Sequence, residues 1–197
     1  MNSSALKLIL ALCLLLSVMQ SWGIGIFQFD RAAIIHGEYW RVLAAHFIHL
    51  NNVHLLLNML GLILVLMLFD GLLTVGQWLA AIIISALMIS VLIFLCLPWV
   101  EGYVGLSGVI HTLYVVGTIQ LLKQPKDRYF GVVLALLVTL KLLTENLGQG
   151  ISLTANLIGG HVLVQSHLFG ALVGVFVAQI LSLLRHNPPE KANNSDI

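Results

Sequence analysis

Residues 76–97 read GQWLAAIIISALMISVLIFLCL, and this stretch decides the class of fold. It is 22 residues long and contains no charged side chain. A helix rises about 1.5 Å per residue, so the stretch is long enough to cross the ~30 Å of hydrocarbon in a bilayer. A run of this length and composition predicts a transmembrane helix.

The composition of the whole chain agrees with this segment. Hydrophobic residues make up 59% of the 197 residues and charged residues only 9%, and the mean hydropathy is +1.02. A soluble domain has about a quarter charged residues, so this chain could not cover its surface in water. We therefore predict an all-α integral membrane protein that has the lipid bilayer as a partner. The net charge of +1 gives no reason to expect nucleic acid.

Further apolar runs predict six spanning helices in one domain, residues 1–186. The runs lie near residues 5–22, 54–69, 76–97, 107–122, 129–147 and 161–184. The first run has no small-x-small cleavage site behind it, so we interpret it as a retained helix rather than a signal peptide. Residues 187–197 are polar and predict a disordered tail.

The connections predict an orientation. Residues 23–53 form a long mixed loop with Phe27, Tyr39 and Trp40, a composition typical of a segment at the lipid headgroups. Six spans would place six basic residues on the side of the termini: Lys7, Lys123, Lys126, Arg128, Arg185 and Lys191. The other side holds three: Arg31, Arg41 and Lys141. Because basic residues favour the cytoplasm, we expect cytoplasmic termini and an external first loop.

Three polar clusters lie within or beside the predicted spans, where ionisable groups are costly and are functional candidates. The clusters, in chain order, are His46, His49, His54 and Asn58; then Gly105, Ser107, Gly108 and His111; then Ser166, His167, Gly170 and Gly174.

Members of the three clusters are expected at one depth in the membrane. Each lies 16 to 18 residues from the charged residue at the far end of its helix: Ser107 from Lys123, His167 from Arg185, and His54 from Asp70. At the helical rise, these separations are about 24 to 27 Å. Asn58 is one turn from His54, about 6 Å deeper. Equal depth is a requirement for contact, and these residues meet it.

The fourth span is expected to be short and to begin at Ser107, after a non-helical stretch at residues 98–105. Irregular backbone at membrane depth needs protein or a water-filled cavity beside it. A serine there would have free backbone N–H groups around it. With His167 to accept its proton, the serine would have what acyl transfer needs: a nucleophile, a base and donors for an oxyanion.

Each residue alone also has a simpler interpretation. A serine between glycines often marks helix packing, and a histidine within a span often makes an interhelical hydrogen bond. Gly170 and Gly174 are interpreted as a packing face, which would bring the sixth span against the fourth. His111 is either a packing partner of His167 or a second base.

Two other clusters receive structural interpretations. His46, His49 and His54 have no HExxH motif or nearby carboxylate, so we predict no metal and no cofactor. Lys141 and Glu145 are interpreted as an ion pair at a helix end. No third carboxylate is therefore expected at the site, and the orientation of His167 is assigned to packing against His111.

The motifs together resemble the rhomboid intramembrane serine proteases over residues ~37–180. Trp40-Arg41 is similar to the Trp-Arg of the family's first loop, and His54-x-x-x-Asn58 to its oxyanion-hole residues. Gly105-x-Ser107-Gly108 resembles the nucleophile motif, and His167-x-x-Gly170-x-x-x-Gly174 the helix of the base. The resemblance implies a Ser107–His167 dyad, with Gly105, Gly108 and His111 beside it.

One departure narrows the resemblance. Many rhomboids have a tyrosine four residues after the serine, where this chain has His111. That residue and Lys141-Leu-Leu-Thr-Glu145 are similar to the rhombosortase branch. This branch implies a bacterial inner membrane and protein substrates that end in a Gly-Gly motif, a single span and a basic tail. Two other classes stay open: a rhomboid-like protein that binds clients without cleaving them, and a small transporter or proton relay.

Overall fold

The computed structural model describes residues 3–147 and 153–186, so the predicted tail, residues 187–197, lies outside the described residues. The long helices are α1 (Ser3–Ser21), α5 (Asn52–Leu68), α6 (Val75–Cys96), α7 (Ser107–Leu122), α8 (Arg128–Leu147) and α10 (Val164–His186). The short elements are α2 (Ile24–Phe27), β1 (Phe29–Asp30), α3 (Arg31–Ile35), α4 (Arg41–Ala44), the 3-10 turn η1 (Ala45–Phe47), β2 (Gly102–Tyr103) and α9 (Leu153–Ile158).

A long helix lies at each of the six apolar runs, but the helices differ in their capacity to cross a membrane. Among the described residues, α1, α6, α8 and α10 are long and apolar enough by themselves. A fifth candidate joins residues 41–47 to α5 across a bend of 88°. The remaining helix, α7, has only 16 residues, or about 24 Å. The protein is thus a helical, multi-pass membrane protein, and the count of six spans stays a prediction.

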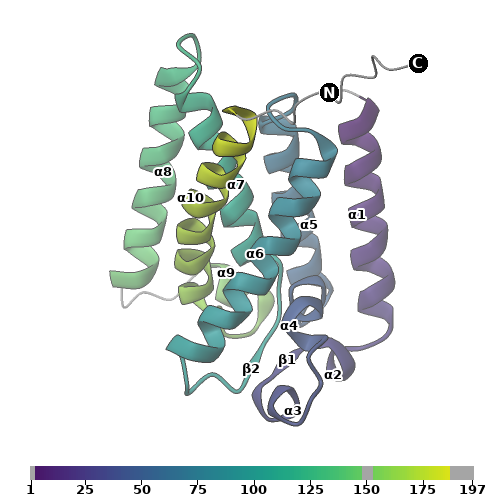
Figure 1. Cartoon of the computed structure of the whole chain (residues 1–197). Helices are drawn as coiled ribbons and strands as arrows, with labels where there is room; N and C mark the ends of the chain where they lie inside the picture. Colours follow the sequence, from purple (N-terminus) through teal and green to yellow (C-terminus); the bar gives the residue numbers. More distant parts are fainter. Residues whose placement is uncertain (1–2, 148–152, 187–197) are drawn as a thin grey trace, which may run out of the picture.

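The long helices run up and down side by side, and α7 lies inside the bundle (Figure 1). Ten of its 16 residues are buried, against α6, α8 and α10. Figure 1 shows α1 and α8 on opposite flanks. In α8, only Gly131 and Leu134 are buried among its described residues, so most of its surface faces outward. Apolar side chains on that outward face fit contact with lipid.

The first loop folds into short elements at one end of the bundle, the lower end in Figure 1. The strand β1 pairs with β2 in antiparallel register, Phe29 opposite Tyr103. The Arg31 guanidinium donates to the carbonyl oxygens of Phe94 and Leu97, each at 2.9 Å. These carbonyls are at the end of α6, where a helix leaves its last acceptors unpaired. The loop is therefore fastened to α6, and its association with a membrane stays a prediction.

The start of α5 is set by a capping residue. The Asn51 side chain accepts a hydrogen bond from the His54 N–H at 3.0 Å, as an N-cap does. The Asn51 amide also donates to the carbonyl oxygen of Ile158 at 2.7 Å, which ties α9 to the same place. The sequence analysis expected the last helix from residue 161; the structure has α9 before it and begins α10 at Val164.

Candidate active site

Ser107 and His167 are in direct contact. Ser107 Oγ lies 2.9 Å from His167 Nε2. Ser107 is the first residue of α7 and is half-buried, and His167 lies in the first turn of α10 with 4% of its surface exposed. The structure thus brings together two residues 60 positions apart in the chain, at the distance that proton transfer requires.

Glycines allow this contact because they let α7 and α10 approach closely. A Cβ atom at Gly170 would collide with the Gly108 backbone, and one at Gly108 would lie 2.9 Å from the Ser166 carbonyl oxygen. One turn further along α10, a Cβ at Gly174 would lie 2.8 Å from Val115. Thr112 Oγ1 closes the interface with a 2.7 Å hydrogen bond to the Gly170 carbonyl oxygen. The predicted packing face of α10 does bring this helix against α7.

His111 lies flat against His167. The two ring centroids are 4.3 Å apart and the rings are 13° from parallel. His111 Nδ1 is 2.7 Å from the Ser107 carbonyl oxygen, so it carries a proton and donates. The imidazole of His111 therefore takes the stacking position expected for it, and the same ring holds the backbone of Ser107.

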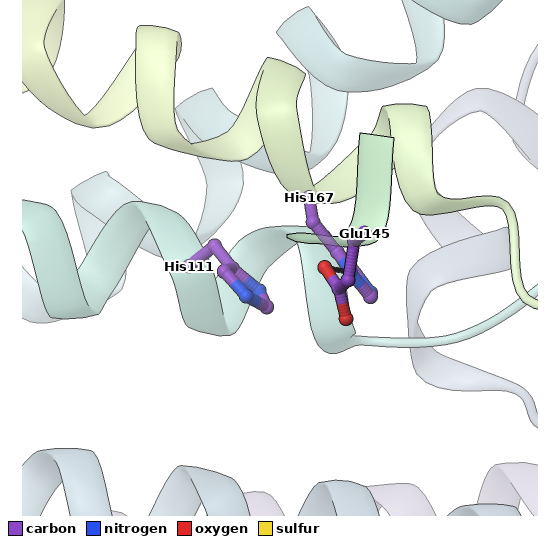
Figure 2. A group of neighbouring side chains, drawn as sticks. All are labelled: His111, Glu145 and His167. Atoms are coloured by element: carbon purple, nitrogen blue, oxygen red, sulfur yellow. Dashed lines mark hydrogen bonds and ion pairs between the residues drawn. The ribbon is translucent and has the colours of Figure 1, made fainter. Parts of the chain in front are cut away.

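A carboxylate also reaches the site, contrary to expectation. Glu145 Oε2 lies 2.9 Å from His167 Nδ1, and Oε1 lies 2.5 Å from Lys141 Nζ (Figure 2). The ion pair of Lys141 and Glu145 is present as predicted, but the prediction of no third carboxylate was wrong. Glu145 is 22 residues from His167 in sequence. Its spacing from Lys141 was already explained by an ion pair, so there was no reason in the sequence to expect a second partner. Only the packing of α8 beside α10 brings the two together.

The expected oxyanion residues, His54 and Asn58, lie on α5 and line one hollow with Ser107 and His167. The His54 ring packs on Gly105, whose φ of +120° and lack of a Cβ are both needed there: a Cβ would lie 2.8 Å from His54. The Asn58 side chain is buried, and its amide donates to the His54 carbonyl oxygen at 3.0 Å. Asn58 is thus beside the site, but in this structure its amide is engaged by its own helix.

The backbone before Ser107 is held by Tyr103. Its hydroxyl donates to the Gly105 carbonyl oxygen at 2.8 Å. Burial raises the pKa of the Tyr103 phenol, so the hydroxyl stays protonated and remains a donor. This contact fixes the turn that leads into α7, whose N-cap residue, Leu106, makes no side-chain capping hydrogen bond. Tyr103 was not among the predicted site residues, because it carries no motif of its own.

Two hollows meet at Ser107 and His54. The larger, of about 690 Å³, opens beside the first loop and includes the polar residues Gln28, Glu101, His161, Gln165 and Ser166. The smaller, of about 250 Å³, lies among α5, α7 and α8 and includes the apolar residues Leu57, Ile110, Leu157 and Val162. The serine therefore lies where a hollow of mixed polar and apolar lining meets a more apolar one.

The site offers poor geometry for a metal ion. Among the described residues, His111, Glu145 and His167 have ligand atoms within 4.8 Å of one another. Ring nitrogens bind metals in the plane of the ring, and stacked parallel rings cannot both place one ion in their planes. His167 also uses both nitrogens already. His46 is held separately, with Nε2 2.9 Å from Ser90 Oγ, and His49 meets His54 edge to face.

The fold and the site define a helical, multi-pass membrane protein with a serine–histidine pair at the start of a short buried helix. A family model of the rhomboid domain matches residues 36–184. The chain therefore belongs to the rhomboid family, whose members are intramembrane serine proteases. No curated protein matches it. The assignment to the rhombosortase branch stays a prediction.

Proposed function

We propose that this protein is an intramembrane serine endopeptidase in which Ser107 is the nucleophile and His167 the base. The observation that carries the proposal is the 2.9 Å separation of Ser107 Oγ and His167 Nε2. The proposal includes the finer architecture expected from the sequence: six spans, cytoplasmic termini and a bacterial inner membrane.

The reaction follows from the hydrogen bonds of the imidazole. His167 Nδ1 faces a carboxylate, which only accepts, so Nδ1 carries the ring proton and Nε2 is free to accept from Ser107. Nε2 takes the hydroxyl proton as Oγ bonds to the scissile carbonyl carbon. Nε2 then gives the proton to the leaving amine as the C–N bond breaks. Water, or another nucleophile, then gives a proton to Nε2 as it attacks the acyl carbon; the bond between that carbon and Ser107 Oγ breaks, and Oγ takes the proton back from Nε2.

The oxyanion is assigned to the Ser107 N–H, His54 and Asn58. The Ser107 N–H is at the uncapped start of α7, and the His54 ring lies across Gly105 from it. In other enzymes one such donor lowers the barrier by about 2.7–4 kcal/mol. Asn58 must leave its bond to the His54 carbonyl oxygen to take part.

The two hollows suit a substrate anchored in a membrane. The apolar hollow fits the end of a transmembrane segment, and the polar one gives water and the extramembrane part of the chain access to Ser107. By resemblance to the rhombosortase branch, through His111, Lys141 and Glu145, we propose substrates with a C-terminal Gly-Gly motif and one span.

Mass spectrometry of a client's new C-terminus, with wild type and Ser107→Ala side by side, tests the proposal. The client has a Gly-Gly motif, a single span and a basic tail. Wild type is expected to release one defined C-terminus, and Ser107→Ala none, because loss of the nucleophile costs about 10⁶-fold in a serine protease. Equal cleavage by both proteins rejects the assignment of Ser107. If the client binds to the wild-type protein without being cut, and no fluorophosphonate labels that protein, the result indicates a non-proteolytic binding protein.

A further inference from the structure

We infer that Glu145 is a positioning residue that Lys141 anchors, so that the site acts as a serine–histidine–glutamate triad rather than a dyad. The inference rests on the proposed function and extends it to a helix, α8, that contributes no other polar contact to His167 among the described residues.

The two carboxylate oxygens of Glu145 are used separately. Oε1 is paired with Lys141 Nζ, and Oε2 accepts from His167 Nδ1. The ammonium fixes the carboxylate from one side, and the carboxylate fixes the ring proton on Nδ1. A ring with its proton on Nδ1 presents the Nε2 lone pair to Ser107 Oγ. The chain Lys141–Glu145–His167–Ser107 is therefore continuous: Ser107 donates to His167, and both His167 and Lys141 donate to the Glu145 carboxylate.

Burial separates this arrangement from an ordinary surface pair. The exposed fraction of the side chain is 47% for Lys141, 17% for Glu145 and 5% for His167. Exposure falls along the chain toward the serine, so the carboxylate reaches inward from a solvated anchor. A pair of this spacing on an open helix contributes only about 0.3–0.5 kcal/mol, and its carboxylate has no reason to meet a third group.

The ring is held on its face as well as on its edge. His111 covers one face of His167 at 4.3 Å, while Glu145 holds the Nδ1 edge (Figure 2). Stacking by itself allows the ring to flip by about 180° around its Cβ–Cγ bond and stay parallel to His111, and a hydrogen bond at Nδ1 disfavours that flip. A negative charge at this edge also stabilises the imidazolium that forms as Ser107 attacks.

Labelling of the purified, full-length protein by a fluorophosphonate probe tests the inference without a natural substrate. Varying the probe concentration separates the maximal labelling rate from the concentration that gives half of it. We expect Glu145→Gln to lower the maximal rate by about 10²-fold, within the range of general base catalysis, and to leave the half-saturating concentration within about twofold. Asn146→Ala, which removes an exposed polar side chain from the same turn, is the matched control and keeps the wild-type rate.

A second variant shows whether Lys141 acts through Glu145. Lys141→Met is expected to lower the maximal rate about tenfold in the wild type and to change nothing further in the Glu145→Gln protein. If Glu145→Gln does not fold, as judged by thermal unfolding, Lys141→Met decides alone: a slower rate supports the inference, and an unchanged rate overturns it.

The outcomes separate the two proposals. If wild type is labelled at Ser107 and Glu145→Gln is labelled as fast, the endopeptidase proposal stands and the triad is overturned. If Asn146→Ala changes both the maximal rate and the half-saturating concentration as much as Glu145→Gln does, the effect comes from a general disturbance of the end of α8. The triad is then also overturned. If Ser107 is never labelled in wild type, the proposed function fails and the inference fails with it.

Discussion

The interface of α7 with α10 and the flank formed by α8 serve the same site in different ways. Between α7 and α10, glycines bring two backbones into contact, and Thr112 closes the gap with a hydrogen bond. Along α8, only Gly131 and Leu134 are buried among the described residues, and the apolar side chains on its outward face fit contact with lipid. Ser107 and His167, the proposed nucleophile and base, are thus fixed by a close-packed pair of helices, while the carboxylate comes from a loosely packed helix. If the proposed function holds, α8 can change the reactivity of Ser107 without moving Ser107 and His167 apart.

The largest effect is expected from breaking the close-packed pair. Gly170→Val places side-chain atoms where the Gly108 backbone lies, so the helices must move apart. A displacement of about 1 Å at a reacting pair costs about 10²-fold, and overpacking destabilises by roughly 1–3 kcal/mol. We expect fluorophosphonate labelling of Ser107 to fall by about 10²-fold or more, together with a lower unfolding temperature. Wild-type labelling by this variant contradicts the assigned role of the interface.

A smaller effect is expected at the stacked ring. His111→Ala removes an aromatic pair worth about 0.5–1.5 kcal/mol and should slow labelling about threefold to tenfold. His111→Tyr keeps a ring on His167 and should restore most of the rate. The comparison separates stacking from proton transfer: a tyrosine variant as inactive as Ser107→Ala identifies His111 as a second base.

The smallest effect is expected on the outward face of α8. Leu140 is 59% exposed and turned away from the site, so Leu140→Ala should change the free energy of unfolding by less than about 0.5 kcal/mol. Labelling should stay within about twofold of wild type. A large loss of labelling here would mean that the outward face of α8 packs on something, and that the two regions differ less than the structure indicates.

Much of the site could be predicted because it follows from distances along helices. The level shared by Ser107, His167 and His54 comes from the constant rise of a helix, and the glycine spacing of α10 marks the face that packs. The error on the carboxylate has an equally clear cause. Lys141 and Glu145 are four residues apart, so each charge already has a partner on the same helix. Nothing in the local sequence required a third residue.

Other features depended on the packing of distant segments. The pairing of β1 with β2 joins Phe29 to Tyr103, and the Asn58 amide is turned to the His54 carbonyl oxygen rather than to Ser107. Neither arrangement has a signature in composition or periodicity, since both depend on which of several allowed hydrogen bonds the folded chain selects.

The sequence alone indicated that the chain belongs in a membrane, where the long helices lie, and how far along each helix the site residues are. These properties depend on residues that are neighbours in the sequence, so they can be predicted without knowledge of the fold. Only the tertiary structure decided that α8 lies close enough for Glu145 to reach His167. A hydrogen bond acts over about 3 Å. Two residues 22 positions apart on different helices come that close only through the packing of the whole bundle.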